Sequence, residues 1–268
     1  MELYPFWLAY PLLGVVVGFF AGLLGVGGGG IMVPMLTSLF LSEGVPKDQV
    51  VHLALGTSMA AITVTSVSSL RAHHAHGAVL WPVVRRITPG ILLGTFLGTF
   101  LASRIASASL AIFFTIFMSY VAFQMLAGLK PKPARELPGA AGLTAVGLFI
   151  GGISALVAIG GGSLTVPFMT CCNVKVQRAI GTSAAIGFPI ALAGTAGYLV
   201  NGLGREGTLD YAVGFIYVPA FVLVSLTSTL TAPLGARLAH RLPVSTLKRI
   251  FAIVLLLLCA KMLSGVFG

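Results

Sequence analysis

The sequence predicts an all-α membrane protein made of two inverted repeats of five helical segments, and three observations lead to this prediction. Of its 268 residues, 57% are hydrophobic and only 8% are charged, with a mean hydropathy of +1.03. A soluble domain has about 25% charged residues. The chain contains many apolar runs close to the ~20 residues that cross a bilayer. A glycine-rich element at 25–34 recurs at 158–167, and both copies interrupt apolar runs.

The first repeat, residues 1–129, begins with a long segment from Phe6 to Leu24. Its glycines at 14, 18 and 22 form one face, and such small residues let helix backbones approach closely in lipid. After the glycine cluster, a short segment from Ile31 to Leu41 has a length of roughly 16 Å. This is about half of a hydrocarbon core, so the short segment cannot cross alone. Three crossing segments are expected to follow, at 49–70, 81–101 and 109–129.

The second repeat, residues 139–268, follows the same plan after a proline-rich linker at 130–138. Gly56-Thr57-Ser58 matches Gly181-Thr182-Ser183 at an offset of 125 residues, and Pro34 matches Pro167 at 133. An internal repeat of this length indicates duplication of a whole five-segment unit. The segments expected in this half are 139–158, 163–172, 176–200, 211–232 and 246–267.

The distribution of basic residues predicts the topology. If each long-plus-short pair enters and leaves the bilayer on one side, the 16 Lys and Arg residues divide twelve to four between the two sides. If each pair makes one broken crossing, they divide eight to eight. Because basic residues gather in cytoplasmic loops, the unequal division favours inverted repeats in a prokaryotic inner membrane, with the linker in the cytoplasm and both termini outside. The net charge of +10 then orients the spans and does not indicate a nucleic-acid partner.

The two glycine breaks predict an anion site near the middle of the bilayer. A broken helix is tolerated there only where it is buried in protein or lines a watery cavity. Each break starts a short helix, whose first N–H groups have no partner within the helix and whose dipole is positive at that end. The alternative is that the glycines only allow a tight hairpin and close packing. The candidate substrate-binding residues at the breaks are Gly27, Gly28, Gly29, Gly30, Gly160, Gly161, Gly162 and Ser163.

Hydroxyl groups form a second candidate pair, Thr57 with Ser58 and Thr182 with Ser183. Their donors suit a small oxyanion, although Ser and Thr in membrane helices often bond to their own preceding carbonyls. His52 and Arg178 precede these two motifs. His52 is a candidate for carrying a coupling proton and Arg178 for attracting the anion. Both lie near segment ends, so a simple interfacial position is the alternative.

Other residues carry less specific signals. His73, His74 and His76 lie in an expected loop from Arg71 to Gly77, which is a solvated loop or, alternatively, the site of a metal-ion carrier. Cys171 and Cys172 are adjacent and predict packed small residues or a reactive thiol pair rather than a disulfide framework. The sequence predicts no cofactor. The Gly90, Gly94 and Gly98 face suits a neighbouring helix or a partner subunit, which leaves a homodimer open.

The sequence bears on three classes of function: an intramembrane enzyme, a secondary transporter and an anion channel. All six acidic residues lie in expected loops or termini, so an intramembrane enzyme is not expected. No nucleotide-binding loop motif is present, which leaves a secondary transporter of small anions or, alternatively, an anion channel. Two interrupted segments at matching places in two halves are the best sequence indication of a transporter's binding site.

The paired motifs resemble those of the sulfite exporter TauE/SafE family of membrane permeases. The resemblance rests on the element at 25–34, on His52-Leu-Ala-Leu-Gly-Thr-Ser58, and on their copies at 158–167 and 179–183, and it covers nearly the whole chain. It implies an inner-membrane transporter of sulfur-containing anions such as sulfite, sulfonates or sulfoacetate. The second repeat has Gln177 in place of His52 and Ser163 in place of Gly30, so the two half-sites are not equivalent.

Overall fold

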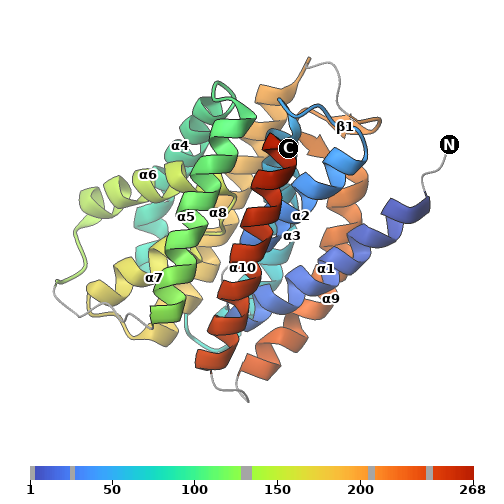
Figure 1. Cartoon of the computed structure of the whole chain (residues 1–268). Coiled ribbons are helices and arrows are strands. Elements are labelled where there is room, and N and C mark those ends of the chain that lie inside the picture. The colour runs from blue at the N-terminus through green and yellow to red at the C-terminus, as the bar shows by residue number, and fades with distance from the viewer. Residues whose placement is uncertain (1–3, 25–27, 128–134, 205–208, 240–243) are drawn as a thin grey trace.

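The computed structural model describes residues 4–24, 28–127, 135–204, 209–239 and 244–268, which form ten helices and one β-hairpin (Figure 1). The helices of the first half are α1 (Tyr4–Leu24), α2 (Gly29–Ser42), α3 (Val50–Ala75), α4 (Trp81–Ala102) and α5 (Ser107–Ala127). Those of the second half are α6 (Ala140–Val157), α7 (Gly162–Cys171), α8 (Val176–Gly202), α9 (Val218–Ala239) and α10 (Val244–Phe267). The hairpin of β1 (Ala212–Val213) and β2 (Ile216–Tyr217) precedes α9. The prediction of an all-α protein is confirmed.

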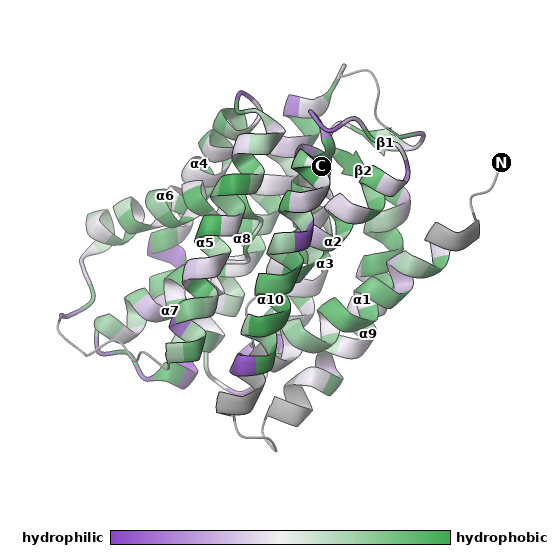
Figure 2. Ribbon diagram, viewed as in Figure 1, coloured by the Kyte–Doolittle hydropathy of each residue, from purple (hydrophilic) through white to green (hydrophobic). Residues whose placement is uncertain are grey.

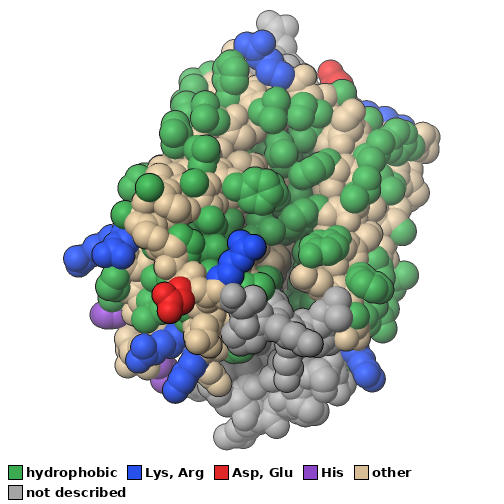
Figure 3. Space-filling model, turned by 90° about the vertical axis from the view of Figure 1, so that its left-hand side faces the viewer, with side chains coloured by type: hydrophobic (Ala, Val, Ile, Leu, Met, Phe, Trp, Pro, Cys, Tyr) green, Lys and Arg blue, Asp and Glu red, His purple; other side chains and the backbone are tan. Residues whose placement is uncertain are grey.

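The helices have the length and the surface of a membrane protein. Six of the described helices are long and apolar enough to cross a bilayer: α3, α5, α6, α8, α9 and α10. Apolar residues run along the helices and polar ones gather at loops and helix ends (Figure 2). Hydrophobic side chains are spread over the face in Figure 3, where charged side chains occur at the upper rim and in the lower half. The protein is therefore a multi-pass membrane protein.

The small-residue faces hold helices of opposite halves together. Gly14, Gly18 and Gly22 of α1 pack against the backbone of α9 near Val224, Ser228 and Ala232, respectively. Gly90, Gly94 and Gly98 of α4 pack in the same way on α6. The Gly90 face is therefore filled by a helix of the same chain. Without side chains between them, the backbones make the close contacts that stabilise helix pairs in lipid.

Neighbouring glycines of α6 give a test of this packing. A Cβ on Gly151 would lie 2.6 Å from the carbonyl oxygen of Ile91 on α4, whereas a Cβ on Gly152 would lie 3.7 Å from that of Gly94. Gly151→Ala is expected to destabilise the protein by about 1–3 kcal/mol through overpacking. Gly152→Ala should be neutral or stabilising, because alanine favours a helix by about 1 kcal/mol over glycine. Thermal unfolding of both variants in detergent measures the difference, and equal melting temperatures would contradict this packing.

Two helix pairs that join the first half to the second are antiparallel. Helices α3 and α8 cross antiparallel, since Gly56 packs near Tyr198 and Met59 near Gly194. Helices α5 and α10 lie side by side and also run oppositely (Figure 1). Hereafter the termini end is the end of the bundle with the start of α1 and the end of α10. The linker end is the opposite one, with the α3–α4 connection and the end of α5.

Two sequence-based boundaries are wrong. The expected loop at Arg71–Gly77 is helical as far as Ala75, because the first residue that cannot continue the helix is Gly77, whose φ is +63°. The helix expected from Tyr211 begins only at Val218, because Gly214 at φ +58° turns the chain into the hairpin.

Candidate functional site

The first break has the geometry predicted for a helix N-terminus. Gly28 has a left-handed backbone, with φ +72°, and its carbonyl accepts the first bonds of α2, from the N–H groups of Ile31 and Met32 at 3.2 and 3.1 Å. The N–H groups of Gly29 and Gly30 come before these bonds and have no partner within the helix. Gly28, Gly29 and Gly30 are buried. Gly27 lies outside the described residues.

The second break repeats this geometry. Gly161 has a φ of +81°, and its carbonyl accepts the first bonds of α7, from Leu164 and Thr165 at 3.2 and 2.8 Å. By the same reasoning, the N–H groups of Gly162 and Ser163 have no partner within α7. Ala158, the last residue before this break, also has a left-handed backbone, at φ 47°. Both short helices therefore begin at a left-handed glycine with two amide donors ahead of the first helical bond.

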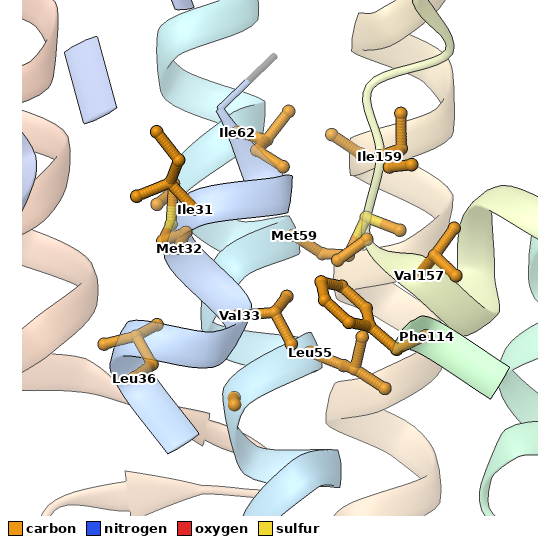
Figure 4. Packing of buried hydrophobic residues seen from close by; sticks show 14 of the residues in the cluster. Ile31, Met32, Val33, Leu36, Leu55, Met59, Ile62, Phe114, Val157 and Ile159 are labelled. Atoms are coloured by element: carbon orange, nitrogen blue, oxygen red, sulfur yellow. The ribbon is translucent and has the colours of Figure 1, made fainter. Parts of the chain in front are cut away.

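The structure brings the two breaks into contact. A Cβ on Gly29 would overlap the carbonyl oxygen of Ala158, and the same Cβ would lie 3.2 Å from Ile62 in the middle of α3. On the other side, Gly187 in the middle of α8 lies against the carbonyl oxygen of Gly160. Figure 4 shows side chains of α2, α3 and the second break converging on one cluster, with Ile159 facing Ile62. The segments that sequence analysis singled out separately thus form one centre.

Three hydroxyl groups near this centre have no hydrogen-bond partner among the described residues. Ser58 and Ser183 are fully buried, and each lies one helical turn before the residue that approaches a break, Ile62 and Gly187 respectively. Thr165, in the first turns of α7, is also fully buried, and its Oγ1 lies beside Gly161. Because a buried hydroxyl without a partner costs about 1–3 kcal/mol, these groups are candidates for contact with a polar ligand.

Thr57 and Thr182 have a structural partner instead. The backbone N–H of Tyr217 donates to Thr57 Oγ1 at 3.0 Å, and the N–H of Leu80 donates to Thr182 Oγ1 at 2.9 Å. Tyr217 and Leu80 are the residues just before α9 and α4. Each threonine therefore satisfies an N–H group at the start of a helix of the other half, a role separate from the predicted contact with substrate.

A pocket of about 100 Å³ reaches the second break from the linker end. The ends of α1 and α9 line it through Gly22 and Pro233, and Gly160 lies at its inner part. The polar side chains of the described lining come from the last turns of α3. They are Thr65, Ser66, Ser68, Ser69 and His73. The pocket thus lies on the linker-end side of the second break.

Aromatic side chains fill the termini end. Tyr10, Phe40 and Tyr217 pack with ring centroids 5.6–6.5 Å apart, and Phe215 packs on Tyr198 at 6.5 Å. Tyr10 also donates to the carboxyl of Glu43 in the turn after α2, where burial raises the pKa of Glu43 above its usual value. This cluster closes the side of the breaks that lies opposite the pocket.

His52 is buried between α3, α4 and α5. Its Nε2 lies 3.0 Å from the carbonyl oxygen of Ala102 and its Nδ1 lies 3.0 Å from Ser107 Oγ. The hydroxyl of Ser107 donates to the carbonyl of Asp48 at 2.7 Å, so both ring nitrogens face groups that accept. A protonated imidazolium satisfies this arrangement, whereas a neutral ring needs Ser107 to turn its proton to Nδ1.

Arg178 is exposed in the first turn of α8, outside the pocket lining.

Comparison with known proteins gives the family. The model of the family described as Sulfite exporter TauE/SafE matches residues 10–262. The chain belongs to the TauE/SafE family. A probable membrane transporter protein of Haemophilus influenzae is 36% identical over 97% of this chain and 99% of its own length. Another from Methanocaldococcus jannaschii is 27% identical over 89% of this chain and 90% of its own, and no solved structure matches.

Two groups of residues in this TauE/SafE protein gave no site of their own. His74 accepts a hydrogen bond from the indole N–H of Trp81, and a ring nitrogen of His76 bonds to the carbonyl of Ala72. Of these three histidines, His73 is the one that lines the pocket. The described residues hold no group of three potential metal ligands. Cys171 and Cys172 are free thiols at the end of α7.

Sequence reasoning missed Thr165, the aromatic cluster and the role of α3 in the TauE/SafE pocket. The signal for the pocket was present: Thr65, Ser69 and His73 recur every four residues, which places them on one helix face. For Thr165 no signal existed, because the matching residue of the first half is Met32.

Proposed function

We propose that this protein is a secondary transporter of small sulfur-containing oxyanions such as sulfite, sulfonates or sulfoacetate. The observation that carries the proposal is the contact between the two breaks, which places two helix N-termini at one buried centre. Amide donors and positive dipole ends favour an anion without a charged side chain, and the unpartnered hydroxyls of Ser58, Ser183 and Thr165 add donors. The family's description as a sulfite exporter supports sulfur oxyanions as the substrate class.

The arrangement of helices supports inverted repeats. In the order of the two halves, α1 corresponds to α6 and α4 corresponds to α9. The packed pair α1–α9 therefore corresponds to the packed pair α6–α4, and the hydrogen bond of Thr57 corresponds to that of Thr182. With α3 antiparallel to α8, the halves are related by an axis in the membrane plane. The described basic residues at the linker end include Arg71, Arg85 and Arg86. By the positive-inside rule the linker end is cytoplasmic and both termini are outside the inner membrane.

The two ends of the bundle differ, with a pocket at the linker end and packed aromatic side chains at the termini end, and this difference supports alternating access. The centre is reached from the linker end through the pocket, while Tyr10, Phe40 and Tyr217 close the termini end. A transporter exposes its site to one side at a time, whereas an open anion channel needs a continuous path. This conformation is the inward-open state, and the outward-open state requires the aromatic cluster to separate.

Proton coupling is assigned to His52, whose hydrogen bonds suit a charged ring and tie α3 to α4 and α5. When His52 loses its proton, Ser107 must give up its hydrogen bond either with Nδ1 of His52 or with the carbonyl of Asp48. The contact of α3 with α5 then changes. His52→Gln installs the residue of the matching position, Gln177, and is expected to flatten the pH dependence of transport between pH 5 and 8, with Kd for substrate little changed. His76→Gln, on the exposed end of α3, is the matched control. An unchanged pH profile in His52→Gln would exclude His52 as the coupling group.

Uptake of sulfite into liposomes that contain the purified protein tests the proposed function. We expect uptake that saturates with sulfite and increases with an imposed pH gradient. Flux that rises linearly with sulfite and follows only the membrane potential would favour the anion channel. Absence of uptake for every sulfur oxyanion would contradict the proposed function.

A further inference from the structure

The pocket at the linker end differs in chemistry from the centre that it reaches. Its polar lining is made by side chains of one helix, α3, and not by helix N-termini. Ser69 is half-buried, and its hydroxyl has no hydrogen bond among the described residues. Thr65 and Ser66 donate to carbonyls of their own helix at 3.0–3.2 Å. The described lining contains no Asp or Glu, so nothing in it repels an anion.

The other half of the chain provides an internal control for these polar residues. The offset of 125 residues relates α3 to α8, and contacts support it: Gly56 packs on the carbonyl of Phe215, and Gly181 packs on that of Ala78. In α8 the positions that match four of these polar residues are buried, and they hold two aliphatic residues, a glycine and a tyrosine. The pairs are Thr65 with Ile190, Ser66 with Ala191, Ser69 with Gly194 and His73 with Tyr198.

The matching positions of α3 and α8 show which side chains this helix face needs for packing. At the termini end, Gly194 packs on Met59, and Tyr198 packs on Phe215 and donates to the carbonyl of Ala155. Small and aromatic residues therefore suffice to build and close this helix face. The polar residues of α3 occur only in the half where the face borders the pocket, so folding alone does not require them. Thr65 and Ser66 bond within their own helix, so Ser69 is the hydroxyl of this wall that would gain a partner from a polar ligand.

We propose that the pocket is a second anion site, a vestibule lined by Ser69 and His73 that holds the oxyanion before it reaches the breaks. This inference rests on the proposed function. The hydroxyl of Ser69 is the donor, while Thr65, Ser66 and His73 keep the wall polar. Basic residues on the same end of the bundle, among them Arg71 and Arg178, raise the local concentration of anions.

The test compares variants in sulfite uptake by liposomes. His73→Tyr installs the residue that fills the matching position in α8 and is expected to raise the KM for sulfite at least tenfold. Ser69→Ala removes one hydroxyl without adding volume and should raise the KM about threefold. His76→Tyr makes the same substitution one turn nearer the exposed end of α3, outside the pocket lining, and should leave the KM unchanged. Melting temperatures near that of the wild type show that each variant is folded.

The outcomes distinguish the vestibule from the proposed function itself. If wild-type protein transports sulfite and both His73→Tyr and Ser69→Ala keep its KM, the vestibule is overturned and the central site stands. An equal rise in KM for His76→Tyr would also overturn the vestibule, because the effect would not depend on the pocket. If wild-type protein neither binds nor transports a sulfur oxyanion, both inferences fail.

Discussion

Gly161→Val is expected to weaken sulfite binding at least tenfold while the protein still folds. Gly161 has a φ of +81°, which a β-branched residue rarely adopts, and its Cβ would lie 2.8 Å from Ile190 Cδ1. The turn must therefore reorganise, and the N–H groups of Gly162 and Ser163 would point away from the centre. The sulfite concentration that gives half-maximal thermal stabilisation measures the effect. Gly28→Val, at φ +72° and close to Val17, should act in the same way on the first break.

Gly204→Val is the matched control for strain. Gly204 also has a left-handed backbone, at φ +75°, but it lies after α8 with nothing within 4 Å of an added Cβ. Strain at such a position costs of order 1–3 kcal/mol, so this variant should lose stability and keep its affinity for sulfite. Equal affinities in Gly161→Val, Gly28→Val and the wild type would contradict a site at the helix N-termini.

Gly29→Ala is the second substitution with a large expected effect. The added methyl would overlap the carbonyl oxygen of Ala158, so one break must move away from the other. Because the obstacle is backbone, we expect a loss of stability at the upper end of the about 1–3 kcal/mol usual for overpacking, together with loss of sulfite transport. Unfolding in detergent and uptake into liposomes measure the two effects.

The neighbouring Gly30→Ala is the folding control for this variant. Its added methyl would lie 3.3–3.5 Å from the side chains of Leu255 and Met118, which are flexible and can adjust. Its melting temperature should therefore stay close to that of the wild type. A Gly29→Ala protein as stable as Gly30→Ala would show that the two breaks are not in contact.

The sequence allowed prediction of the helices and of the breaks for a simple physical reason. Glycine runs interrupt apolar helices wherever they occur, and spacing by four residues defines a helix face independently of its partner. The short segments after Gly30 and Gly162 were therefore recognisable by length alone. The identity of the partners was not, because Gly18 on α1 meets Ser228 on α9, more than 200 residues away.

The division of roles among hydroxyl groups depended on tertiary structure. Thr57 and Ser58 are adjacent, yet Thr57 binds the N–H of Tyr217 and Ser58 has no partner among the described residues. That difference arises from the start of α9, which no local pattern near residue 57 specifies. Similarly, His73 was assigned to a loop because histidine-rich stretches are usually solvated, whereas the helix continues past it and places it in the pocket.

Ligand-induced thermal stabilisation of the purified wild-type protein tests most directly whether its centre binds a sulfur oxyanion. The panel is sulfite, thiosulfate, sulfate, sulfoacetate and chloride, with a metal cation and a neutral solute for comparison. A ligand that binds only the folded state adds about 2.7 kcal/mol at a concentration 100 times its Kd. We predict selective stabilisation by one or more sulfur oxyanions. No response to any anion, together with stabilisation by the cation or the neutral solute, would contradict an anion site at the paired breaks.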